Sequence, residues 1–243
     1  MIKIIILAAG KGKRMNSDLF KALTLIKGKP MIEYLVKAIS KSSIDKNPII
    51  VVSPNNKELI KKALIRYKCE YAIQKEQLGT GHALLCAKKM IGKNVDHILC
   101  FYGDHPFFKP GTIKKIAYSH SGAITIMTVG VKDFKGWREV FYHWGRVLRN
   151  YGRVKQIVEF KDATEKIKKI REVNPAIYCF AAKWLWQNIA KLKNNNASKE
   201  YYLTDLINFA FKQELNINSF PIDAEEAIGV NTQTELKIAE SII

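Results

Sequence analysis

The residues best suited to bind or transfer a charged group follow the first apolar run, Ile2–Leu7. The chain continues with Ala8-Ala9-Gly10-Lys11-Gly12-Lys13-Arg14. Small residues let a backbone approach a ligand closely, and the N–H groups over positions 8–12 can surround phosphate oxygens. Arg14 can neutralise phosphate through its planar guanidinium and Lys21 as a point charge. The loop therefore predicts an anion site, and the alternative is a glycine turn with solvated lysines.

This first loop carries neither of two common phosphate-binding fingerprints. After Gly10 and Gly12, the third glycine position of a dinucleotide motif holds Met15. A P-loop is also excluded, because no G-K-[ST] follows the first glycine at the required distance. A second loop, Gln77-Leu78-Gly79-Thr80-Gly81-His82-Ala83, combines glycines with a hydroxyl and predicts contact with a base or sugar edge. Its alternative is an ordinary helix start capped by Thr80.

Two further polar residues flank predicted elements, and a third, Glu159, stands on the predicted strand 154–160. Asp104 comes directly after the apolar run His97–Tyr102, where a carboxylate can hold Mg²⁺ together with substrate phosphates. Its alternative is an Asx turn, and we interpret its neighbour His105 as a hydrogen-bonded loop histidine. Asn231 lies just before a capping box, Thr232-Gln233-Thr234-Glu235, so it is a second candidate metal ligand or a simple helix-entry residue. Glu159 can accept hydrogen bonds from sugar hydroxyls, and its alternative is a surface pair with Lys161.

Strands and helices alternate along the chain, which predicts an α/β fold. The expected architecture is a Rossmann-like, mostly parallel mixed sheet flanked by helices, and no linker divides residues 1–243, so we expect a single domain. The predicted strands are 2–7, 48–53, 69–73, 97–102, 123–131, 154–160, 177–181 and 217–220. The predicted helices are 30–41, 56–67, 81–91, 112–120, 183–192, 201–213 and a last one from Thr232. Ligands of such sheets bind at the carboxyl ends of the strands.

Composition limits the compartment and the partners. The chain has 243 residues, 47% hydrophobic and 26% charged, and no apolar run approaches the roughly 18 residues of a membrane span. The four scattered cysteines contain no C-x-x-C pair and indicate a reducing compartment, so we expect a cytoplasmic protein with no membrane partner. The net charge of +18 is spread along the chain without a basic tail or nucleic-acid motif. It therefore favours small phosphorylated substrates, and no nucleic acid partner is expected.

Several blocks together resemble the sugar nucleotidyltransferase superfamily. Within it, the chain is similar nearly end to end to the uridyltransferase half of bifunctional N-acetylglucosamine-1-phosphate uridyltransferases, without the acetyltransferase domain. The first loop marks only the superfamily, and the later blocks are more specific. The matching blocks are 7–15, Lys21, 77–83, 102–104, 145–146, Val158-Glu159-Phe160-Lys161-Asp162-Ala163-Thr164, Asn174, Glu200-Tyr201-Tyr202-Leu203-Thr204-Asp205 and 229–231.

The resemblance implies a nucleotide-diphospho-sugar transferase fold with a nucleotide-binding N-terminal part and a sugar-binding C-terminal part. It implies Mg²⁺-dependent attack of N-acetylglucosamine 1-phosphate on UTP, which releases pyrophosphate and yields a cell-wall precursor. Arg14 and Lys21 would be catalytic, and Asp104 and Asn231 would hold the metal. The nucleotide would contact Leu7, Ala8, Ala9, Gly10, Gln74, Gly79, Thr80, Tyr102 and Gly103. The sugar would contact Gly145, Glu159, Asn174, Tyr202 and Thr204.

The chain departs from the family pattern at several positions. Phe20 stands where a proline usually precedes the lysine, Lys13 replaces a threonine, and His105-Pro106-Phe107 replaces a more apolar stretch. Asn174-Pro175-Ala176-Ile177 replaces N-T-G-I and loses a glycine beside the sugar. The alternatives are the same chemistry with another base, CTP included, or another hexose 1-phosphate, and a sugar-nucleotide-binding protein without turnover. Acetyl transfer is not expected, and no oligomeric state is predicted.

Overall fold

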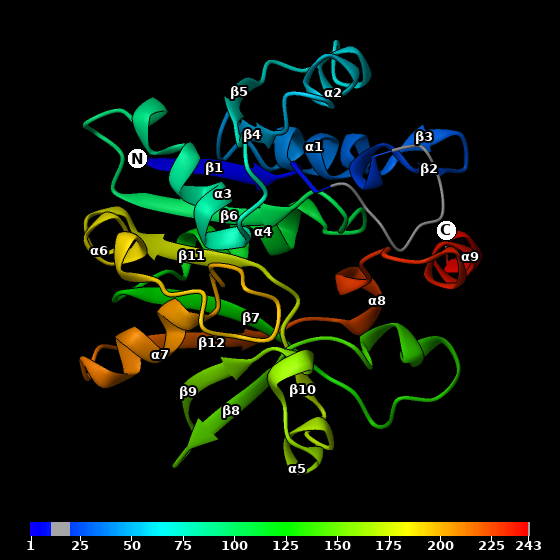
Figure 1. Cartoon of the computed structure of the whole chain (residues 1–243). Helices are drawn as coiled ribbons and strands as arrows, with labels where there is room; N and C mark the ends of the chain where they lie inside the picture. Colours follow the sequence, from blue (N-terminus) through cyan, green and yellow to red (C-terminus); the bar gives the residue numbers. More distant parts are fainter. Residues whose placement is uncertain (11–19, 243) are drawn as a thin grey trace.

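A ten-stranded sheet runs through the protein in the order β5-β4-β1-β6-β11-β7-β10-β8-β9, with β12 paired to β7 (Figure 1). The computed structural model describes residues 1–10 and 20–242. The strands are β1 Ile2–Leu7, β4 Ile49–Val52, β5 Glu70–Ile73, β6 His97–Tyr102, β7 Ile124–Gly130, β8 Arg146–Asn150, β9 Arg153–Val158, β10 Glu172–Val173, β11 Tyr178–Ala181 and β12 Ile217–Pro221. A separate hairpin joins β2 Leu25–Ile26 to β3 Lys29–Pro30.

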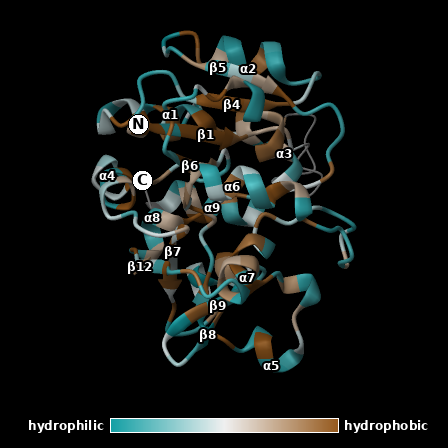
Figure 2. Cartoon of the chain, turned by 90° about the vertical axis from the view of Figure 1, so that its left-hand side faces the viewer, coloured by the Kyte–Doolittle hydropathy of each residue, from teal (hydrophilic) through white to brown (hydrophobic). Residues whose placement is uncertain are grey.

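The first half of the sheet is parallel. β1 pairs with β4 on one side and with β6 on the other, and β4 pairs with β5. Successive residues of these strands are buried on opposite faces: Ile4 and Ile6 enter one core cluster and Ile5 the other. Burial on both faces explains why these strands are continuous apolar runs, as Figure 2 shows for β1 and β4.

The second half of the sheet is largely antiparallel. β11 lies antiparallel to both β6 and β7, and β10, β8 and β9 continue the antiparallel pairing. Only β12 restores a parallel pair in this half, beside β7, among the residues described. The predicted mixed α/β sheet with flanking helices is confirmed. The sequence prediction did not include β8 or β10, whose alternating and very short patterns carry little apolar signal.

Helices cover both faces of the sheet. One core cluster takes residues from α1 Met31–Ser42, α2 Lys57–Ala63, α4 Pro110–Tyr118, α8 Ala224–Ala227 and α9 Gln233–Ile242. The other takes residues from α3 Thr80–Cys86, α6 Ala182–Asn188 and α7 Asp205–Lys212. The short helix α5 Glu165–Lys168 lies beside the antiparallel strands, in the lower part of Figure 1.

Two properties of the described chain bear on its environment. None of its helices combines the length and the apolar character that a membrane span requires. All four cysteines are free thiols, and Cys100 and Cys179 are buried in the sheet. The cysteines therefore pack as small core or near-core residues.

Candidate functional site

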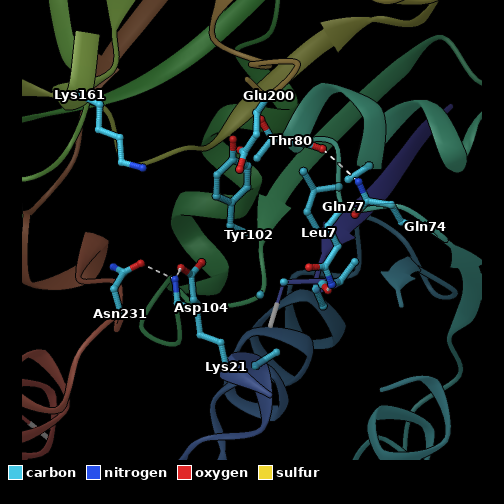
Figure 3. A pocket seen from close by; sticks show the side chains of 17 residues that line it. Leu7, Lys21, Gln74, Gln77, Thr80, Tyr102, Asp104, Lys161, Glu200 and Asn231 are labelled. Atoms are coloured by element: carbon cyan, nitrogen blue, oxygen red, sulfur yellow. Dashed lines mark hydrogen bonds and ion pairs between the residues drawn. The ribbon is translucent and has the colours of Figure 1, made fainter. Parts of the chain in front are cut away.

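A cavity of about 540 Å³ opens at the carboxyl ends of β1, β5 and β6. The three strands are parallel, so the loops that follow them meet at one edge of the sheet. Figure 3 shows side chains from these loops and from the later segments converging on this space. The lining residues are Leu7, Ala8, Ala9, Gly10, Lys21, Ala22, Gln74, Gln77, Gly79, Thr80, Ala83, Tyr102, Gly103, Asp104, Lys161, Glu200 and Asn231.

A charged cluster formed by Lys21, Asp104 and Asn231 lies at one side of the cavity. The Lys21 ammonium donates to a carboxylate oxygen of Asp104 and to the side-chain oxygen of Asn231 (Figure 3). Burial raises the pKa of Asp104, but the charge of Lys21 and the nearby His105 outweigh it, so the net pKa lies below the ordinary value. Asp104 is therefore held as a carboxylate that pairs with Lys21.

The loop before α9 brings Asn231 to this cluster. The backbone N–H of Val230 donates to the Asp104 carbonyl at 3.0 Å, which joins the two loops. The predicted capping box is confirmed: the N–H of Thr232 donates to the Glu235 carboxylate at 3.0 Å, and the N–H of Glu235 donates to the Thr232 hydroxyl at 3.2 Å. The Glu235 carboxylate also accepts from the N–H of Asn231. The cap thus fixes Asn231 as well as the helix start.

His105 supports this corner from behind. Its Nδ1 lies 2.9 Å from the Ala227 carbonyl, and its ring stacks on Phe108 with centroids 5.5 Å apart. A Cβ on Gly229 would come within 2.9 Å of the imidazole, so this position accommodates only glycine at the present spacing. Burial lowers the pKa of His105 even beside Asp104. These contacts agree with the interpretation of His105 as a hydrogen-bonded loop histidine.

The glycine loop 77–81 is fastened to the segment before α7. Tyr201 donates its N–H to the Leu78 carbonyl and accepts the N–H of Gly81, both at 2.8 Å. The Thr80 hydroxyl accepts the N–H of Leu203 at 3.0 Å. Gly79 has φ +106°, and a Cβ there would lie 2.8 Å from the backbone of Tyr201. The cap of α3 is Gly79, so the alternative role of Thr80 as the helix cap is wrong.

The same hydrogen bonds explain why the predicted helix 201–213 starts too early. Because the backbone of Tyr201 is committed to the glycine loop, α7 begins only at Asp205. Tyr202 and Thr204 therefore lie before the helix, with Thr204 at its cap position. Similarly β9 ends at Val158, so Glu159 lies just beyond the strand that was predicted to contain it.

Two amide side chains hold the start of the first loop. Gln77 donates to the Ala9 carbonyl at 2.6 Å, and the fully buried Asn56 donates to the Ala8 carbonyl at 2.8 Å. The start of the loop, at Ala8 and Ala9, is thereby fixed beside the cavity. Arg14 falls in 11–19, outside the described residues, together with Lys13 and Met15.

The predicted sugar residues form a second polar group beside the cavity. The Thr204 hydroxyl donates to the Glu159 carboxylate at 3.0 Å, and the Asn174 amide donates to the Tyr178 hydroxyl at 2.6 Å. The rings of Tyr178 and Tyr102 lie 6.5 Å apart between centroids. Tyr102 lines the cavity, so it connects the cavity wall to Tyr178 of the second polar group. Burial raises the pKa of Glu159, and the Thr204 hydrogen bond lowers it only in part.

The structure thus brings the predicted nucleotide and metal residues, together with Lys21, to one cavity. The predicted sugar residues Gly145, Glu159, Asn174, Tyr202 and Thr204 do not line that cavity. Gly145 packs against Ile157 and Glu159, and its carbonyl accepts the N–H of Asn174 at 3.0 Å. Burial raises the pKa of Tyr202 to about 12, so its phenol stays protonated.

Four polar residues at these sites were not among the predicted site residues. Gln77, Lys161 and Glu200 line the cavity, and all three stand in motif blocks that the sequence analysis quoted. Lys161 points toward the cavity from the side opposite Gln74 (Figure 3). Tyr178 lies in a buried strand, where its alternation with apolar residues gave no sign of a polar role.

Ala176, which stands where the family pattern has a glycine, keeps a backbone conformation that favours glycine. Ala176 has φ +56°, in the left-handed region that favours glycine, and it is buried. Its N–H donates to the Asn174 side chain at 3.1 Å. The turn therefore keeps a glycine-like conformation while carrying a methyl group, at a cost of about 1 kcal/mol.

Fold and cavity together define a nucleotide-binding α/β protein whose ligand site lies beyond the carboxyl ends of parallel strands. A family model described as the MobA-like NTP transferase domain matches residues 4–202, and the chain belongs to this family of nucleotidyltransferases. The resemblance inferred from the motif blocks is thereby confirmed at the level of the family.

Individual relatives agree with this assignment. The chain is 40% identical over 242 residues to the bifunctional protein GlmU of Clostridium botulinum, covering 98% of this chain and 51% of that protein. The protein of the same name from Shouchella clausii is also 40% identical over 242 residues, with the same coverage of 98% and 51%. The chain thus spans about half the length of the curated relatives it matches.

A solved structure shows the same fold. The inositol-1-phosphate CTP transferase from T. maritima superimposes with a TM-score of 0.73 at 16% sequence identity. The alignment covers 99% of this chain and 95% of that chain. The antiparallel second half of the sheet is therefore part of the shared architecture.

Proposed function

We propose that this chain transfers UMP from UTP to N-acetylglucosamine 1-phosphate, giving UDP-N-acetylglucosamine and pyrophosphate. The observation that carries the proposal is the cavity at the strand ends, where the motif residues of the uridyltransferase pattern converge around Lys21, Asp104 and Asn231. The relatives named GlmU support it, because the chain matches them over 98% of its own length. The product would be a cell-wall precursor made in the cytoplasm.

The chemistry needs alignment and charge neutralisation. An oxygen of the sugar 1-phosphate attacks the α-phosphorus of UTP, and the bond from that phosphorus to the pyrophosphate oxygen breaks. No covalent bond to the enzyme forms, so the chain needs no serine or cysteine nucleophile. The backbone of Ala8–Gly10 and the ammonium of Lys21 would hold the phosphates in line, and this positioning supplies most of the acceleration.

The residues present fit a magnesium ion. Asp104 and Asn231 aim two oxygens at one cation, which is the Lys21 ammonium in this structure. Mg²⁺ commonly takes one or two carboxylates and completes its shell with water and substrate phosphates. When bound, the ion would neutralise phosphate charge. Asp104, held as a carboxylate, and Asn231 would hold it, and Lys21 would then turn to the phosphates.

The sugar would lie toward the second polar group. Glu159 can accept hydrogen bonds from sugar hydroxyls while it holds Thr204. Asn174 and Tyr178 offer an amide and a phenol beside Tyr102. Lys161 lines the cavity, and its ammonium would contact a phosphate oxygen.

The test is pyrophosphate release with Mg²⁺ across four nucleoside triphosphates and a panel of hexose 1-phosphates. We expect release with UTP and N-acetylglucosamine 1-phosphate, lost on adding EDTA. Asp104→Asn and Lys21→Ala should each lose at least about 100-fold in kcat/KM. Asp133→Asn is the matched control, because Asp133 pairs with Arg138 away from the cavity. If the chain binds UDP-sugar but releases pyrophosphate with none of the substrate pairs, the enzymatic proposal is wrong and the chain is a sugar-nucleotide-binding protein.

A second candidate is the same transfer to a different hexose 1-phosphate or from a different base. Ala176 favours it, because its methyl group stands in the turn that also holds Asn174. The fold allows it, since the T. maritima neighbour is a CTP transferase. Pyrophosphate release only with another substrate pair would select this candidate and keep the mechanism.

A further inference from the structure

The amide of Gln74 is held in one orientation at the cavity wall. Its Nε2 donates to the Gly79 carbonyl at 3.2 Å, drawn as a dashed line in Figure 3, and lies 3.1 Å from His82 Nδ1. A carbonyl oxygen can only accept, so Gly79 identifies the nitrogen end of the amide. None of the described residues donates to Oε1 of Gln74. The amide therefore offers an acceptor for a ligand.

The orientation of Gln74 also fixes the tautomer of His82. Because Nε2 of Gln74 is the donor, Nδ1 of His82 must be the acceptor, and the ring proton lies on Nε2. That Nε2 faces Cys86 Sγ at 3.9 Å, and Cys86 is one helical turn further along α3. Burial raises the pKa of Cys86, so a neutral thiol faces the ring. His82 therefore connects the side-chain amide of Gln74 to helix α3 through hydrogen-bond contacts.

We propose that His82 is a positioning residue that sets the preference of the cavity for uracil; this inference rests on the proposed function. Gln74 has two N–H groups, and Gly79 and His82 use both. Only the oxygen remains for the base. With N1 bonded to ribose, uracil has a single N–H donor, at N3, whereas cytosine presents a lone pair at N3. A fixed acceptor therefore favours UTP and repels CTP in the same pose.

Without the imidazole, the second N–H of Gln74 loses its partner. The Gly79 carbonyl alone then opposes rotation of the amide about its last side-chain bond, so that rotation loses one hydrogen bond instead of two. The rotated amide would present nitrogen to the cavity, which suits the cytosine lone pair. The reacting phosphorus is bound by other residues, so His82 should affect base binding and leave the chemical step unchanged. This separates a positioning role from a general loss of structure, which would lower kcat as well.

The test is equilibrium binding of UTP and of CTP by titration calorimetry, without sugar phosphate. His82→Leu and His82→Phe remove the acceptor, and two variants are used so that one poorly folded protein does not decide the result. In each variant, we expect the ratio of the affinity for UTP to the affinity for CTP to fall about tenfold. His82→Gln, which can accept through its own oxygen, should restore the ratio to within about threefold. In pyrophosphate release, the apolar variants should raise KM for UTP about tenfold with kcat within about twofold.

Cys86→Ala is the matched control, since it changes the far side of the imidazole and should keep the wild-type ratio. An unchanged ratio in both apolar variants, or a His82→Gln protein as poor as His82→Leu, overturns the role of His82 while the proposed function stands. A wild-type chain that binds neither nucleotide overturns the proposed function itself. The two failures are therefore distinguishable.

Discussion

Glu159 is a carboxyl group placed where its charge is unfavourable. Burial raises its pKa in the folded state above the value of about 4.3 expected in the unfolded chain. The unfolded state therefore releases this proton first, and the contribution of Glu159 to stability falls as pH rises above about 4.3. A buried carboxylate with this cost fits the proposed contact of Glu159 to sugar hydroxyls.

We expect Glu159→Gln to be more stable than wild type at pH 7, with Tm higher by about 2–4 °C for a gain of about 1 kcal/mol. The amide still accepts from Thr204 but carries no charge. The gain should shrink near pH 4, where the wild-type carboxyl is protonated, and KM for the sugar phosphate should rise. Thermal unfolding at both pH values measures this, with the exposed Glu165→Gln as control. A lower Tm at pH 7 would contradict the sign argued here.

Ala176 gives a second test at a single residue. Its left-handed backbone conformation costs an alanine about 1 kcal/mol and costs a glycine almost nothing. Removing the methyl group also loses apolar burial and adds freedom to the unfolded chain, so we expect Ala176→Gly to change stability by less than about 1 kcal/mol. If the methyl group restricts the sugar, KM for N-acetylglucosamine 1-phosphate should fall about threefold or more. Denaturant unfolding and steady-state kinetics check the two parts, and a large loss of stability would show that the methyl group is needed for packing.

At the scale of elements, the start of α9 connects a helix cap to the proposed metal site. Thr232→Ala removes the hydroxyl that accepts the N–H of Glu235, at a typical cost of about 1 kcal/mol. Because the same cap fixes the loop of Asn231, the Mg²⁺ concentration needed for half-maximal activity should rise several-fold. Pyrophosphate release across a Mg²⁺ series measures this effect. Thr164→Ala, which removes the cap of α5, is the matched control and should leave the Mg²⁺ requirement unchanged.

Elements also show which features the sequence could predict. The parallel strands were predicted because burial on both faces makes each one a continuous apolar run. The capping box was predicted because it depends on two residues three positions apart. The turn at 201–204 was missed because its conformation depends on hydrogen bonds to residues more than 100 positions away. Tyr178 was missed because its own neighbours give only a core pattern, although its hydroxyl accepts from Asn174 and its ring lies near Tyr102.

At the scale of the whole molecule, the charge of +18 should act on substrates before they bind. Both proposed substrates are phosphate anions, and a basic surface raises their encounter rate. Salt screens this attraction, with a Debye length of about 10 Å at 0.1 M and about 3 Å at 1 M. We expect kcat/KM for UTP to fall several-fold as salt rises over this range, with kcat nearly constant. A kcat/KM that stays constant across the salt series would show that the charge serves another purpose.

The fastening of the glycine loop to the segment at 201–203 has a consequence for how this protein can vary. Three backbone-directed hydrogen bonds fix the register of one loop against the other. Adding or deleting a residue between the bonded positions of either loop would break the register of at least one of these hydrogen bonds. The two motifs therefore have to be inherited, exchanged or redesigned together, as one part encoded by two distant stretches of the gene.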